Sequence, residues 1–172
     1  MANAVAGRTA TSTMNLTSGT INVAGDIART NGGGVENTSL VLNGATVILN
    51  MGGFNIGSST ASIGSGTGAL TLQAGTLRNV GEINGGANWT KTGVSTDILN
   101  LDTANNFSGQ VTVAGGVLAV SHGSALGGTT NGTTIAAGGK LALSGGITIS
   151  GESLALTADS SANNASVSNV SG

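Results

Sequence analysis

The chain has 172 residues and a net charge of −2, with 31 glycines, no proline and no cysteine. Aromatic residues make up only 2% of it, which disfavours an ordinary globular enzyme, because a domain of this size normally packs its core around several aromatic side chains. Hydrophobic residues still reach 38%, chiefly Val, Ile, Leu and Ala, and this content disfavours simple disorder.

The basic residues predict no nucleic-acid partner, because phosphate binding needs clustered Lys and Arg side chains. Here they are scattered singly, at Arg8, Arg29, Arg78, Lys91 and Lys140. No apolar run approaches the roughly 18 residues of a membrane span, so we expect no membrane insertion by this segment. The first twenty residues lack the features of a signal peptide. An exported form of the protein is therefore expected to be longer than this chain.

Strands are the expected secondary structure, because glycine interrupts almost every window and Thr, Ser, Asn and Val are poor helix formers. The first clear repeat has two alternating runs, residues 40–42 and 46–49, separated by Asn-Gly-Ala at 43–45. Later copies lie at 70–77, 111–120, 133–143 and 147–156. In each copy apolar residues stand two apart, which predicts strands with one buried face.

A parallel β-helix explains this pattern best, because short strands that repeat without aromatic anchors can stack as the rungs of a solenoid. At roughly 20 to 25 residues per rung, the chain would make about seven or eight rungs. An antiparallel sandwich is the alternative, but it usually has aromatic packing between its sheets and proline at its edges.

The alternation also predicts which side chains fill the interior of the solenoid. They are Leu70, Leu72, Leu77, Val111, Val113, Leu118, Ile135, Leu141, Leu143, Ile147, Ile149, Leu154 and Leu156. If residues 70–72 paired with Leu77 in an antiparallel hairpin, the turns would be reversals and not corners between faces.

Residues 88–120 closely resemble the passenger-associated transport repeat of bacterial autotransporters, also called the autotransporter-associated beta strand repeat. The matching residues are Trp89, Lys91, Gly93, Leu99, Leu101, Asn105, Phe107, Gly109, Val113, Gly116 and Leu118. Ser-Ala-Leu-Gly at 124–127 is a familiar continuation. The sequence departs from the family pattern at Phe107, where Tyr is usual, at Gln110, where a second Gly is common, and in a longer turn before Ile98.

The resemblance implies an all-β chain folded as a right-handed parallel β-helix, within a secreted passenger at the surface or outside of a Gram-negative-type bacterium. It also implies that the repeat assists passage across the outer membrane and folding outside. We expect an N-terminal edge or appended segment at 1–13, the β-helix at 14–157, and a polar partial rung or frayed tail at 158–172.

Few residues are candidates for chemistry. Asp97 and Asp102 are the only close pair of acids that could flank a glycosidic bond, and exposed turn positions are the simpler interpretation. His122 is the sole imidazole, and no motif supplies it with a nucleophile and an orienting acid. The loops at 32–37 and 64–68 are interpreted as glycine turns, and not as calcium or phosphate sites.

Trp89 is expected to pack in a structural position, although an exposed tryptophan could stack on sugars. We therefore expect no catalytic, cofactor-binding or metal-binding residues, and no cofactor.

Three functions remain open on this basis. The first is a non-enzymatic structural segment that forms a rigid extracellular rod and assists its own secretion. The second is an adhesive surface for host or neighbouring cells, and the third is a polysaccharide-active β-helix. The expected partners are neighbouring rungs of a longer chain or copies of this chain stacked end to end, with a cell-surface glycan or protein as a further candidate.

Overall fold

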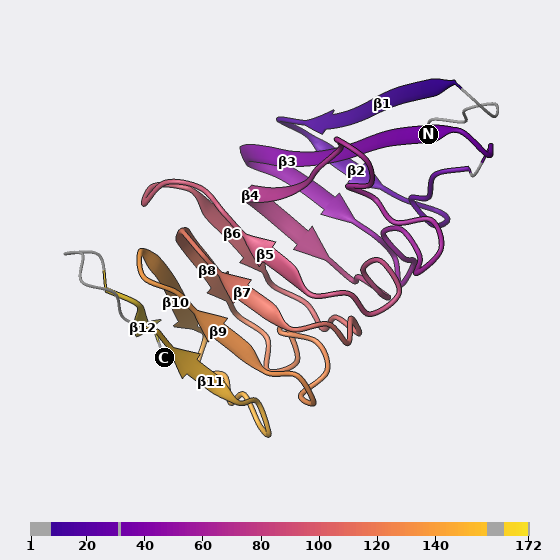
Figure 1. Cartoon of the computed structure of the whole chain (residues 1–172). Coiled ribbons are helices and arrows are strands. Elements are labelled where there is room, and N and C mark those ends of the chain that lie inside the picture. The colour runs from indigo at the N-terminus through magenta and orange to yellow at the C-terminus, as the bar shows by residue number, and fades with distance from the viewer. Residues whose placement is uncertain (1–7, 31, 158–163, 172) are drawn as a thin grey trace.

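The computed structural model describes residues 8–30, 32–157 and 164–171, and these residues form an all-β fold (Figure 1). No helix in those ranges is long and apolar enough to cross a membrane. The described strands are β1 (Thr9–Leu16), β2 (Thr20–Asn22), β3 (Val35–Asn50), β4 (Leu70–Arg78), β5 (Trp89–Lys91), β6 (Ile98–Leu101), β7 (Val111–Val113), β8 (Gly116–Val120), β9 (Thr133–Ile135), β10 (Gly139–Ser144), β11 (Leu154–Leu156) and β12 (Ser166–Ser171).

All the strand pairs are parallel, so the chain winds as a solenoid from β1 at one end to β11 and β12 at the other (Figure 1). The first face stacks β1, the beginnings of β3 and β4, then β5, β7, β9 and β11. The second face stacks β2, the ends of β3 and β4, then β6, β8, β10 and β12. A third, irregular face is marked by the bridges Ile27 to Ile56 and Ile56 to Ile83.

The described residues make about 6 turns of the solenoid, which confirms the parallel β-helix and lowers the expected rung count. We number the rungs from 1 to 6 by their first-face strands β1, β3, β4, β5, β7 and β9, and β11 begins an incomplete seventh. The rungs differ in length along the solenoid. Leu40 pairs with Leu70, an advance of 30 residues, whereas Leu72 pairs with Lys91, an advance of 19.

The corners between the first and second faces explain the glycine turns of the repeats. Strands β3 and β4 each run through such a corner without a break, where two separate runs were expected in the first repeat. Burial switches there from even positions, such as Leu42, to odd positions, such as Leu49. At the β4 corner Gly75 has φ +119°, and a Cβ on it would come within 2.5 Å of Val47 Cγ1. The turns are therefore corners, and the hairpin between residues 70–72 and Leu77 does not form.

Most of the predicted interior column is buried. Leu72, Leu77, Val111, Val113, Leu118, Ile135 and Leu141 are buried, and Leu70, Leu143, Ile147 and Ile149 are partly buried against them. Leu154 and Leu156 continue the register of the buried Thr133 and Ile135, but they are 38% and 54% exposed. Both lie on β11, which pairs with β9 on one side only, so no described rung covers them.

Two described strands lie in or reach into the segments expected to flank the solenoid. Strand β1 begins at Thr9, before the expected start at residue 14, and pairs with β3 over its whole length. Strand β12 pairs with β10 within the expected polar tail. The remainder of those expectations, at residues 1–7, 158–163 and 172, lies outside the described residues.

Close stacking at one corner gives a direct test of the fold. A Cβ on Gly109 would lie 2.0 Å from Ala87 O, whereas a Cβ on Gly25 would meet nothing within 4 Å. Gly109→Ala is therefore expected to lower the free energy of unfolding by roughly 1 to 3 kcal/mol, because backbone must move to admit the methyl group. Gly25→Ala should stay within about 0.5 kcal/mol of the parent.

Urea unfolding followed by far-ultraviolet circular dichroism measures both variants. Equal unfolding midpoints for Gly109→Ala and Gly25→Ala would contradict the stacking of these rungs.

Candidate functional site

The residues that resemble the transport repeat form a packed connection across rungs 3 to 5. Trp89 and Phe107 are buried and meet edge to face, with ring centroids 5.4 Å apart and an interplanar angle of 89°. Aromatic pairs favour this geometry, because the positive edge of one ring faces the negative face of the other. Trp89 is therefore a core residue, and it is not available as a sugar-stacking platform.

Asn105 ties three rungs together through its buried side chain. Its Oδ1 accepts a hydrogen bond of 2.9 Å from Val80 N in rung 3, and its Nδ2 donates one of 2.8 Å to Ala125 O in rung 5. The side chain thus replaces strand pairing on the third face. The Asn105 amide suits this position because it carries an acceptor and a donor at once.

Lys91 is fully buried within an otherwise aliphatic column of the first face. Its partners in register are Leu72 below it and Val113 above it. The ammonium group turns into the corner, where Nζ donates to Thr92 O and, at 3.1 Å, to Gly115 O. Burial lowers the pKa of Lys91 to about 8, and the charge of Asp97 opposes this shift only in part.

Gly116 makes room for this ammonium group. A Cβ on Gly116 would lie 2.6 Å from Lys91 Nζ, and the glycine also has φ +68°. A buried cation that is satisfied by carbonyl oxygens needs this open space beside it. Lys91 and Gly116 therefore act as one structural unit.

The predicted acid pair does not come together. Asp97 and Asp102 lie at opposite ends of β6, about 16 Å apart along an extended strand. Asp97 Oδ2 accepts from Val94 N at 2.9 Å, and Asp102 is held by two nitrogens of Arg78. Carboxyl groups that cleave a glycosidic bond lie much closer, at roughly 5 to 9.5 Å.

The other predicted positions have local structural roles. His122 Nδ1 accepts a hydrogen bond of 3.1 Å from Ser124 N in an exposed turn. Gly32 N donates to Glu36 Oε1 in the first glycine loop. In the second loop, Asn37 Oδ1 accepts from Thr67 N at 2.9 Å. Among the described residues, no three His, Cys, Asp or Glu side chains lie close enough together to hold a metal ion.

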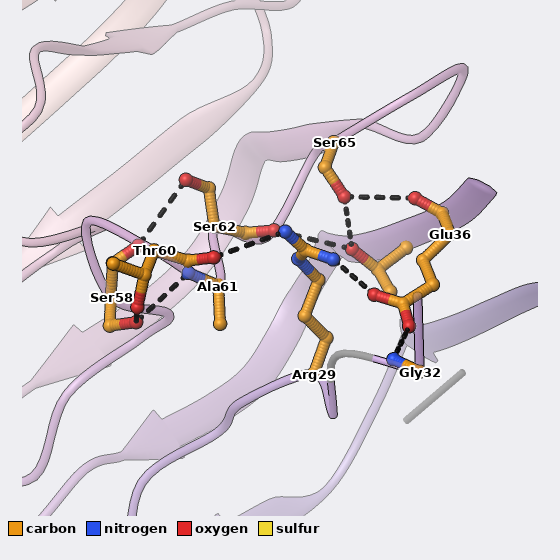
Figure 2. A network of polar contacts seen from close by, with 9 residues as sticks. Arg29, Gly32, Glu36, Ser58, Thr60, Ala61, Ser62 and Ser65 are labelled. Carbon is orange, nitrogen blue, oxygen red and sulfur yellow. Dashed lines mark hydrogen bonds and ion pairs between the residues drawn. The ribbon is translucent and has the colours of Figure 1, made fainter. Parts of the chain in front are cut away.

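A polar network around Arg29 and Glu36 was missed by the sequence reasoning (Figure 2). Glu36 is only 4% exposed and forms an ion pair with Arg29, which also reaches Thr60 O at 3.3 Å. Ser65 Oγ donates to Glu36 O at 3.0 Å. The network fastens the loop between β3 and β4 to rung 1. Its signal in the sequence was the pair of opposite charges that flank the glycines at 32–34.

An asparagine ladder was also missed, at the corner between the second and third faces. Asn50 Nδ2 donates to Asn22 Oδ1 at 3.0 Å, and Asn79 Nδ2 donates to Asn50 Oδ1 at 2.9 Å. The signal was an Asn at the end of β2 and of β3 and directly after β4, but it can be seen only once the register is known.

The fold and these contacts together define a parallel β-solenoid whose inward polar side chains tie neighbouring rungs together. Over 84 residues, 49% of this chain, the sequence is 34% identical to the protein named adhesin BmaC autotransporter of Brucella suis biovar 1 (strain 1330). That stretch is only 2% of the length of the relative. The chain is thus similar to a small part of an autotransporter adhesin.

No protein-family model matches the chain, so the resemblance at 88–120 to the transport repeat lacks a family match. No solved structure matches the chain either.

The buried lysine predicts a rise in stability with pH. Because the pKa of Lys91 is about 8 in the folded protein and 10.5 when unperturbed, the unfolded chain binds more protons between these values. Below pH 8 the folded state carries the free-energy cost of burying the charged Lys91 ammonium group. This cost disappears as the pH rises and Lys91 loses its proton. The free energy of unfolding should increase by roughly 1 to 3 kcal/mol across this interval.

Urea unfolding at a series of pH values measures this increase, and the absence of Tyr and Cys leaves few other groups to titrate there. Lys91→Met should abolish the increase, whereas Lys140→Met should keep it. An equal increase in Lys91→Met would show that another group is responsible.

Proposed function

We propose that this chain is a non-enzymatic structural segment of a secreted autotransporter-like passenger. It forms a rigid extracellular β-helical rod and assists its own translocation and folding. The observation that carries the proposal is the buried connection of Trp89, Lys91, Asn105 and Phe107, which joins successive rungs with side chains that a binding surface would leave exposed. The similarity to an autotransporter adhesin supports a cell-surface or extracellular location.

Assistance in secretion follows from the way a solenoid folds. Each rung packs only on its neighbours, so the fold can grow by one rung at a time as the chain emerges from a pore. Each fully buried Val, Leu or Ile side chain contributes roughly 1.5 to 3 kcal/mol before the entropy of ordering is subtracted. A rung that has folded outside is too wide to slide back, so this free energy biases the movement outward.

A display experiment tests this proposal. The chain is placed between a signal peptide and an outer-membrane autotransporter barrel in a Gram-negative host, and surface exposure is measured by protease treatment of intact cells. We expect the parent chain and Gly25→Ala to be displayed equally. Gly109→Ala should be displayed several-fold less, because its rungs stack less favourably. Equal display of Gly109→Ala, with its destabilisation established in vitro, would contradict a role for folding in secretion.

An adhesive surface is the second candidate function, and the name of the relative favours it. The matched protein is called an adhesin, and the outward positions of this chain's strands are largely Thr, Ser and Asn. Such a surface could contact a host or neighbouring cell while the interior serves as the scaffold.

The partner that we propose for the open end of the solenoid is another rung, from a longer chain or from a second copy. Leu154 and Leu156 continue the register of the buried residues Thr133 and Ile135, yet they are exposed. On β12, Val167 is 38% exposed opposite the buried Leu141. Unpaired strand edges with apolar residues favour edge-to-edge association.

Sedimentation across a hundredfold range of concentration tests the association of copies of this chain. We expect the parent to self-associate, and Leu156→Lys to remain monomeric because a charge at the open end opposes strand addition. Val94→Lys is the control, since Val94 is 65% exposed on a mid-solenoid corner. A parent that stays monomeric throughout, or a Leu156→Lys variant that associates like the parent, would contradict stacking of copies.

A further inference from the structure

A shallow groove crosses the corner between the second and third faces over rungs 2 to 4. Its volume is about 380 Å³, and it is lined by Gly52, Gly53, Asn79, Val80, Ala104 and Asn106. None of these residues carries a charge. The groove is separate from the buried connection described above, although Asn105 lies between two of its lining residues.

The groove has a simple structural cause. Asn50 pairs with Arg78 and Ile56 is bridged to Ile83, so residues 51–55 form this corner in rung 2 and residues 79–82 form it in rung 3. The corner of rung 3 is therefore one residue shorter than the corner of rung 2. Gly52 and Gly53, with φ +61° and +91°, keep the adjoining wall free of side chains.

An exposed aromatic ring lies next to Gly52, toward rung 1 and outside the lining of the groove. Phe54 is 40% exposed, and its ring is 3.7 Å from the position that a Cβ on Gly52 would occupy. The other two aromatic residues of the chain, Trp89 and Phe107, are buried against each other. Exposure of Phe54 is thus an exception in a chain that otherwise buries its few rings.

The polar groups around the groove restrict what it can bind. Five of its backbone amides already donate within the protein: Gly52 N to Asn50 Oδ1, Gly53 N to Asn79 O, Asn79 N to Thr103 Oγ1, Val80 N to Asn105 Oδ1 and Asn106 N to Val80 O. A peptide therefore finds no free edge for strand addition. The exposed side-chain amide of Asn106 has no hydrogen-bond partner among the described residues, and it can both donate and accept.

We propose that this groove is a binding site for a neutral saccharide, which deepens the adhesive function proposed above and rests on it. Sugar hydroxyls both donate and accept, so they suit the Asn106 amide and the free acceptor capacity of Asn79 Oδ1. The C–H face of a pyranose ring packs on an aromatic ring, so a second sugar unit that extends beyond the groove would pack on Phe54. Because no charged residue lines the groove, an acidic sugar finds no counter-ion there.

The experiment uses an array of neutral and acidic hexose oligosaccharides, followed by calorimetric titration with the neutral oligosaccharide that gives the strongest signal. We expect binding of neutral members only. Phe54→Ala and Asn106→Ala should each weaken the affinity at least tenfold, and Phe54→Trp should keep it. Val94→Ala is the matched control, because it removes an exposed apolar side chain at the corner between the first and second faces.

Two results would overturn the proposal: no neutral oligosaccharide binds, or one binds with equal affinity to the parent and Phe54→Ala. Circular dichroism of each variant verifies that the solenoid is folded. Surface display of the same variants distinguishes the failure of this binding site from the failure of the proposed passenger function. Loss of sugar binding with normal display is expected for Phe54→Ala, whereas failure of the parent to be displayed would count against the passenger segment itself.

Discussion

Parallel pairing in register is the constraint on which the rest of this structure depends. Leu99, Leu118 and Leu141 lie directly above one another, so each inward side chain packs on its counterparts in the rungs above and below. Rungs in a parallel sheet are about 4.8 Å apart. Most interior positions hold Val, Ile or Leu, and Trp89, in register with Val111, shows that a wide side chain also fits.

The same constraint decides where polar side chains can be buried. A solenoid turns at its corners, and there some backbone carbonyl and amide groups lose their strand partners. Lys91 reaches carbonyl oxygens at one corner, and Asn105 satisfies an amide and a carbonyl on the irregular third face. Each therefore replaces backbone pairing where the path of the chain interrupts it. The network of Arg29 and Glu36 has the same role at a long loop in rung 2.

The sequence predicted the buried residues of the two regular faces but not the contacts at the corners. Period-two alternation identified Leu72, Val113 and Leu118 as interior residues, because a strand with one buried face leaves that pattern. The third face has no such pattern, so Ile27, Ile56 and Ile83 were not placed. The burial of Lys91 and the ladder of Asn22, Asn50 and Asn79 depend on residues from different rungs, and their proximity is decided by the register. Exposure of Leu154 and Leu156 could not be predicted either, because alternation indicates a direction and not whether a neighbour covers it.

The separation between faces and corners has a consequence for function. A residue inserted in or removed from a face would turn every following inward side chain outward, because the side-chain period is two. A residue removed from a corner leaves the register of both flanking faces intact, as the pairs Asn50 to Arg78 and Ile56 to Ile83 demonstrate around a corner that is one residue shorter. A corner can therefore change length without shifting the register of the core. The groove proposed above lies at such a corner, where a binding site can form without disturbing the inward side chains.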